Sequence, residues 1–160
     1  MTDILVLVGS LRAASLNRQI AELAVELGAA EGLDVTVSGG LAELPFYDED
    51  LDTADAPAGV TALREAAGDA DAVLAVTPEY NGGIPAVLKN AIDWLSRPYG
   101  DGAINGKPVA VIVKFSGADS SAAVRRWSDL LVCEHLALEA IAGALGIAAA
   151  TNAFAYWNAD

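Results

Sequence analysis

The chain has 160 residues with a formal net charge of −13, and 54% of its residues are hydrophobic. So apolar a composition excludes a disordered chain, and the excess of acidic side chains argues against nucleic acid or an anionic membrane as the main partner. The length fits one domain, residues 1–160, that is able to bury a core and to take a small-molecule ligand.

The single cysteine, Cys133, excludes an internal disulfide and favours an intracellular, cytoplasmic protein. The first apolar run, at 4–8, follows no basic segment and is too short to span a bilayer. We therefore expect no signal peptide, membrane span or lipid anchor.

Short apolar runs alternate with segments of helical spacing along the chain. The continuous, β-branched run ILVLV at 4–8 predicts a strand covered on both faces. After it the sequence predicts, in order, a helix at 15–32, a strand at 33–40, an acidic loop at 41–59, a helix at 60–70, a strand at 71–78, a helix at 84–96, a loop at 99–106, a strand at 108–116, a helix at 120–145 and an alanine-rich strand at 146–156. The last helix is either continuous or interrupted near Cys133.

This alternation predicts βαβ units with right-handed crossovers and a parallel sheet. Five strands at this spacing fit a doubly wound α/β fold with strand order 2-1-3-4-5. In that order strands one and three are neighbours, and ligands bind beyond their carboxyl ends, where the strand order reverses. The loops expected there are 9–17 and 77–83.

The first of these loops, GSLRAASLN at 9–17, combines Ser10, Arg12, Ser15 and Asn17 with the start of a helix. Free backbone N–H groups, the helix dipole and a guanidinium together form a phosphate site. The alternative is a polar turn in which Ser15 only caps the helix, and the two interpretations are compatible. The loop has neither the Gly-Lys-Ser/Thr of a Walker A motif nor a G-x-G-x-x-G pattern.

The second loop, TPEYNGG at 77–83, carries an acid, an aromatic ring, an amide and two glycines. A flat heterocycle with polar edges fits such a loop, with Tyr80 beside the ring. The alternative is a decorated turn in which Tyr80 covers apolar surface. Side by side, the two loops predict a mononucleotide site with phosphate at one end and a planar ring at the other.

Three stretches carry a family resemblance: GSLRAASLN at 9–17, PEYNGGIPAVLKNAIDW at 78–94 and LPFYDEDL at 44–51. With them, residues 4–115 resemble the NAD(P)H-dependent FMN reductases, flavodoxin-like proteins that include quinone, azo-dye and chromate reductases. The resemblance implies an FMN oxidoreductase with NAD(P)H as co-substrate. Its acceptor would be a quinone, an azo compound, a metal oxyanion or free flavin.

The resemblance also implies roles for individual residues. The FMN phosphate would be held by Ser10, Arg12, Ser15 and Asn17, and the ring would be lined by Pro78, Glu79, Tyr80, Asn81 and Gly82, with Ser116 approaching the flavin after strand four. Lys89, Asn90 and Asp93 would be structural. No side chain is expected to act as a catalytic acid or base, because the flavin carries the chemistry. The resemblance further implies a homodimer or homotetramer.

The sequence departs from the resemblance after strand four, where KFSGADSSAA at 114–123 replaces a Gly- and Ser-rich loop. The final helix of the family is also expected to be absent. Two other functions therefore stay open: a flavin-binding electron carrier without NAD(P)H oxidation, and a flavin-free interaction protein. No metal is expected, because Cys133, Glu134 and His135 are consecutive and diverge around a helix.

Overall fold

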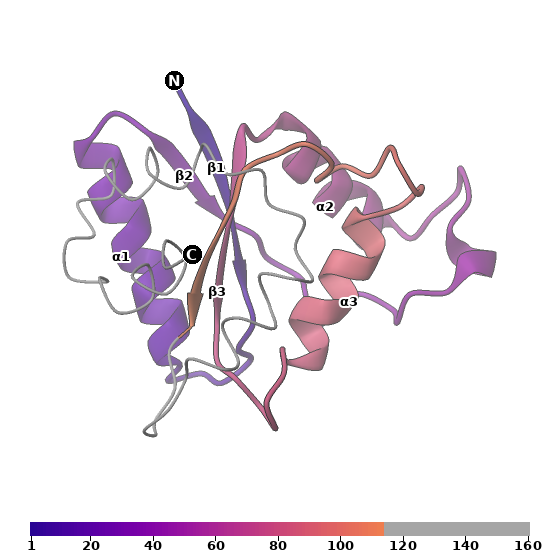
Figure 1. Ribbon diagram of the computed structural model, residues 1–160, viewed down its shortest axis with the longest axis horizontal. Helices are drawn as coiled ribbons and strands as arrows, with labels where there is room; N and C mark the ends of the chain where they lie inside the picture. Colours follow the sequence, from indigo (N-terminus) through magenta and orange to yellow (C-terminus); the bar gives the residue numbers. More distant parts are fainter. Residues whose placement is uncertain (114–160) are drawn as a thin grey trace, which may run out of the picture.

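The computed structural model describes residues 1–113 (Figure 1). Four predictions lie outside the described residues: the helix at 120–145, the strand at 146–156, the position of Ser116 and the absence of a final helix.

The described residues form a four-stranded parallel sheet in the order β2-β1-β3-β4. Its strands are β1 (Asp3–Val8), β2 (Asp34–Val37), β3 (Ala72–Thr77) and β4 (Val109–Val113). The order confirms the doubly wound arrangement for these strands, with β1 and β3 as neighbours. β2 is shorter than predicted, because after Ser38 the chain leaves the ladder through Gly39 and Gly40.

Helices cover both faces of the sheet. The long helices are α1 (Leu16–Ala30), α2 (Ala58–Asp69) and α3 (Ala86–Leu95), and a short 3₁₀ helix, η1 (Glu49–Leu51), interrupts the predicted loop at 41–59. In Figure 1, α1 lies on one side of the sheet and α2 and α3 lie on the other. Right-handed crossovers require this division, because the chain moves one way from β1 to β2 and the opposite way afterwards.

Alternation along the strands produces two cores. In β1, Ile4, Val6 and Val8 pack on the α1 face, whereas Leu5 and Leu7 pack with α2 and α3. All five side chains are buried, as the continuous apolar run predicted.

Local chemistry sets the helix ends. The Ser15 hydroxyl accepts from the Arg18 N–H at 3.3 Å and caps α1, which ends before Gly32 with a φ of 76°. Pro57 and Pro85 each occupy the cap position before a helix and contribute no side-chain cap bond. α2 consequently begins two residues before the predicted start and α3 two residues after it.

Candidate functional site

The loops after β1 and β3 leave the sheet at adjacent points. Val8 pairs with Val76 in the β1–β3 register, and the Gly9 N–H donates to the Val76 carbonyl at 2.9 Å. In Figure 1 the two loops run along the same edge of the sheet, at the bottom of the view. The structure thus brings the two predicted site loops together at the reversal of strand order.

Gly9 makes this close approach possible. A Cβ at Gly9 would lie 2.2 Å from Thr77 Oγ1 and 2.8 Å from Thr77 Cβ, closer than side-chain atoms pack. Thr77 cannot easily retreat, because it is fully buried and its hydroxyl donates to the Pro78 carbonyl at 2.9 Å. Glycine is therefore required here for contact between two strand ends rather than for a positive φ.

The first loop buries three of its four predicted residues, one just after β1 and two at the start of α1. Ser10, Ser15 and Asn17 are buried, with 4%, 3% and 5% of their surfaces exposed. Asn17 Oδ1 is fully enclosed and finds no hydrogen-bond partner among residues 1–113. Arg12 is exposed and forms no ion pair with those residues.

A buried carboxamide oxygen without a hydrogen-bond partner is costly unless a ligand or another group satisfies it. The O and N of an asparagine exchange by a half-turn of the amide, so Asn17 is able to offer either an acceptor or a donor. With the N-terminal end of the α1 dipole and the exposed Arg12 guanidinium, which forms no ion pair within residues 1–113, this group of side chains suits a phosphate. The structure also confirms Ser15 as the helix cap, and the phosphate interpretation stays a prediction that is compatible with this cap.

The second loop is a tight hairpin. Tyr80 and Gly83 exchange backbone hydrogen bonds of 3.0 and 3.1 Å. Between them Asn81 and Gly82 have φ values of 54° and 75°, as a type I′ turn requires. Pro78 is buried, Glu79 is half-buried, and Tyr80 remains 51% exposed. About half of the Tyr80 surface is therefore open to solvent, which argues against the alternative that Tyr80 covers apolar surface.

Sequence reasoning assigned Asn90 a structural role without finding its partners. Its Oδ1 accepts from the Tyr47 N–H at 2.8 Å, and its Nδ2 donates to the Pro45 carbonyl at 2.9 Å. The Trp94 indole N–H donates to the same carbonyl at 2.9 Å. These bonds fasten residues 44–52, which we term the strap, to the flank of α3. The sequence contains both halves of this contact, LPFYDEDL at 44–51 and the motif at 78–94, but it does not show that they touch.

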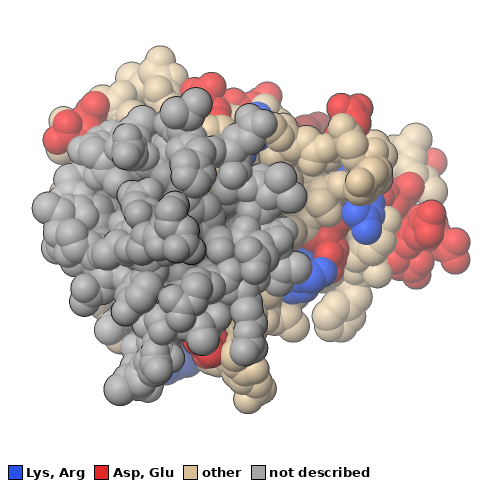
Figure 2. All heavy atoms as spheres, viewed as in Figure 1, with Lys and Arg blue, Asp and Glu red and all other residues tan. Residues whose placement is uncertain are grey.

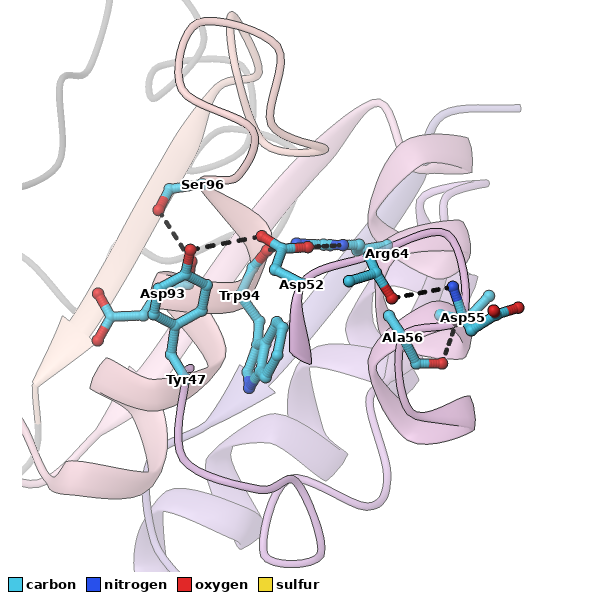
Figure 3. Close-up of polar contacts among 10 residues, drawn as sticks. Tyr47, Asp52, Asp55, Ala56, Arg64, Asp93, Trp94 and Ser96 are labelled. Carbon is cyan, nitrogen blue, oxygen red and sulfur yellow. Dashed lines mark hydrogen bonds and ion pairs between the residues drawn. The ribbon is translucent and has the colours of Figure 1, made fainter. Parts of the chain in front are cut away.

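Aromatic and charged contacts complete the strap (Figure 3). The Tyr47 ring meets Trp94 edge-on, with centroids 4.9 Å apart. Arg64 of α2 donates to the Trp94 carbonyl at 2.9 and 3.1 Å and forms an ion pair with Asp52 at 2.8 Å. The hydrogen bond from Arg64 holds the pKa of the Asp52 carboxyl below its ordinary value. Lys89 pairs with Asp93 on α3, which agrees with a structural role for both.

Acidic side chains gather away from the two loops. Figure 2 shows a group of carboxylates at the end of the molecule that carries η1. The sequence places Asp48, Glu49, Asp50, Asp52 and Asp55 there. The net charge is thus compatible with an anionic ligand at the sheet edge, because screening over about 8 Å at physiological salt weakens distant repulsion.

A parallel sheet of this order, with polar loops after its two central strands, defines a flavodoxin-like α/β protein. The chain belongs to the NADPH-dependent FMN reductase family, whose model matches residues 2–152. This confirms the resemblance seen in the sequence. The family implies FMN as cofactor and a nicotinamide nucleotide as electron donor.

Individual relatives agree with the family match. The chain is 44% identical over 120 residues to a 2-hydroxy-1,4-benzoquinone reductase of Burkholderia sp, covering 74% of this chain and 63% of that protein. It is 42% identical over 110 residues to a quinone reductase of Escherichia coli K12, covering 68% and 57%. The chain thus spans about three fifths of the length of these relatives.

Solved structures extend the comparison. FerB, a flavoenzyme NAD(P)H:(acceptor) oxidoreductase from Paracoccus denitrificans, matches with a TM-score of 0.73 and 40% identity, over 85% of this chain and 76% of that chain. An azoreductase of Bacillus anthracis str. Sterne matches with a TM-score of 0.63 at 20% identity, over 96% and 99%, and shares the fold. Within residues 1–113, no helix has both the length and the apolarity needed to cross a bilayer.

Proposed function

We propose that this protein is an NAD(P)H-dependent FMN oxidoreductase that reduces a small-molecule acceptor. The observation that carries the proposal is the meeting of two unusual loops at adjacent strand ends, one of them with the buried Asn17 Oδ1, which has no hydrogen-bond partner within residues 1–113. Membership of the FMN reductase family supports the same cofactor.

The first loop would hold the FMN phosphate. Ser10 and Ser15 line it with hydroxyls, Asn17 supplies the carboxamide, and Arg12 supplies the one full positive charge of the loop. Such charge-assisted hydrogen bonds are roughly twice as strong as neutral ones. Arg12 is free to make them, because it forms no ion pair within residues 1–113.

The second loop would set the position of the isoalloxazine ring. The I′ turn fixes the backbone from Pro78 to Gly82, so its N–H and C=O groups and the Tyr80 ring form a prepared edge. Ser116 would approach from the loop after β4. When bound, FMN accepts hydride from the nicotinamide and passes electrons to the acceptor, while the protein supplies binding, orientation and electrostatics.

A quinone is the acceptor class that we favour, because proteins at 42–44% identity are named quinone reductases. Azo compounds, metal oxyanions and free flavin remain alternatives of the same chemistry. We further propose that the protein works in the cytoplasm as a homodimer or homotetramer, in keeping with its lone cysteine and with the family resemblance.

The test is NAD(P)H consumption by the purified protein with FMN and 1,4-benzoquinone. We expect loss of the nicotinamide absorbance that depends on protein, FMN and quinone together. Bound flavin without nicotinamide oxidation would instead identify an electron carrier. Failure to bind FMN would instead support the third alternative, a flavin-free interaction protein with the same fold.

A further inference from the structure

The Thr77 hydroxyl fixes one peptide group of the loop at 77–83. It donates to the Pro78 carbonyl at 2.9 Å, and the Thr77 side chain is fully buried. The hydroxyl has little room to move, because Oγ1 lies so close to Gly9 that a Cβ there would approach to within 2.2 Å. A β-branched side chain is also restricted at χ1. The Pro78 carbonyl is therefore held on the side that faces Thr77.

The same contact sets the direction of a backbone donor. The Pro78–Glu79 peptide is trans, so its C=O and N–H groups point in opposite directions. With the carbonyl turned toward the Thr77 hydroxyl, the Glu79 N–H points away from it. The hairpin agrees with this direction, because Tyr80 and Gly83 exchange both backbone hydrogen bonds, and the residue before such an antiparallel pair directs its N–H outward.

The Glu79 N–H is a donor without an acceptor in the described part of the chain. No backbone or side-chain group of residues 1–113 accepts from it, and Glu79 is half-buried. The loop that carries it lies beside the proposed phosphate loop, since Val8 and Val76 are paired just before the two loops. An N–H in this position suits the polar edge of a planar ring, whose carbonyl oxygens and imine nitrogens are acceptors.

We propose that Thr77 is a positioning residue for the flavin, because its hydroxyl holds the Pro78 carbonyl and so presents the Glu79 N–H to the polar edge of the isoalloxazine ring. Without the hydroxyl, the peptide is free to rotate and to place a carbonyl acceptor where the ring requires a donor. Thr77 thus acts through the Pro78–Glu79 peptide rather than by contact with the ring. This inference rests on the proposed function, because it needs a flavin at the two loops.

The test compares two substitutions at Thr77 by FMN titration and by the visible spectrum of the bound flavin. Thr77→Val keeps the branched shape and removes the hydroxyl. Its Kd should rise about fivefold, as expected for the loss of one neutral hydrogen bond, and its bound spectrum should differ from that of the wild type. Thr77→Ser keeps the hydroxyl and should retain the wild-type Kd and spectrum. A Thr77→Val protein with wild-type Kd and spectrum would overturn the inference.

Two controls separate positioning from stability and from the phosphate contact. Val73→Ala truncates the core near the other end of β3, so it should lower Tm and leave the FMN Kd and the bound spectrum unchanged. Arg12→Ala should raise Kd and yet give the wild-type spectrum at saturation, because it acts at the phosphate end. If Thr77→Val lowered Tm alone, as Val73→Ala does, Thr77 would be structural only and the inference would be wrong.

Hydrogen exchange of the Glu79 amide, followed by NMR, gives a readout that is independent of affinity. Saturation with FMN should slow this exchange in the wild type and in Thr77→Ser, and much less in Thr77→Val. If FMN bound to the wild type but left the exchange unchanged, the positioning role would be refuted while the proposed function stood. A wild-type protein that binds no FMN would overturn both.

Discussion

Gly9 and Thr77 bring the ends of β1 and β3 into contact, and the proposed site depends on that contact. The Gly9 backbone donates to Val76 and leaves no room for a Cβ beside Thr77. A phosphate loop and a ring loop are able to serve one ligand only because these two strand ends touch. Packing at a single glycine therefore determines the distance between the two halves of the site.

Gly9→Ala should accordingly weaken both folding and FMN binding. The new methyl would overlap Thr77 Oγ1, and we expect a loss of about 1–3 kcal/mol in the free energy of unfolding. Urea denaturation measures the loss, and FMN titration measures the accompanying change in affinity. Thr77→Ala removes the obstructing hydroxyl, so the Gly9→Ala/Thr77→Ala protein should be more stable than additivity predicts. Simple additivity would show that the contact does not limit the site.

Single residues also show how far sequence reasoning reached. It placed Ser10, Ser15 and Asn17 in the loop between β1 and α1, and the structure shows all three buried there, while their role as phosphate ligands stays a prediction. The unpaired state of Asn17 Oδ1 was not foreseeable, since it depends on which neighbours reach it in three dimensions. The hairpin of residues 80–83 was also missed, although its Asn-Gly pair is the usual signal for a type I′ turn.

The strap and α3 act together as one element. The Asn90 side chain joins α3 to the strap, because it accepts from the Tyr47 N–H and donates to the Pro45 carbonyl. Asn90→Asp would keep the acceptor for Tyr47 but would place a carboxylate oxygen against the Pro45 carbonyl. We expect a loss of about 2–3 kcal/mol in unfolding free energy by urea denaturation. Asn105→Asp, at an exposed loop position, is the matched control and should change stability little; equal losses in the two variants would refute the bridging role.

Asp52 gives the strap a dependence on pH. Its folded-state pKa lies below the unfolded value of about 3.8, chiefly through the Arg64 hydrogen bond. The ion pair therefore stabilises the protein fully above that value and is lost as pH falls through the folded-state pKa. The stability difference between wild type and Asp52→Asn should be present near neutral pH and should shrink as the pH falls below the unfolded value and through the lowered folded-state pKa. A difference that is independent of pH would argue against the ion pair as its source.

Elements differ in how far the sequence determined them. Continuous apolar runs placed β1, β3 and β4 to within a few residues, because burial on both faces leaves little ambiguity. Helix boundaries were less certain, since Pro57 and Pro85 start α2 and α3 through backbone geometry that hydrophobic periodicity does not report. The short helix η1 and the strap were read as loop, because their order comes from contacts with distant Asn90, Trp94 and Arg64.

At the scale of the described domain, residues 1–113, both proposed site loops lie at one edge of the sheet. Two cores, one on each face, hold the strands in parallel register, and both site loops leave from the same edge. The acidic end around η1 lies elsewhere, so binding of an anionic cofactor must depend on local donors rather than on the overall field. Among these donors Arg12 carries the charge, and its removal should affect the cofactor more than the fold.

The most direct measurement is a titration of the purified protein with FMN, followed by visible absorbance and flavin fluorescence. The wild type should change the FMN spectrum saturably with one flavin per chain. Arg12→Ala should raise Kd about tenfold or more, as expected for the loss of a charge-assisted phosphate contact. Lys89→Ala, which removes a cation already paired with Asp93, should leave Kd unchanged. An FMN spectrum that the wild-type protein does not alter would contradict the account, as would an Arg12→Ala protein with wild-type affinity.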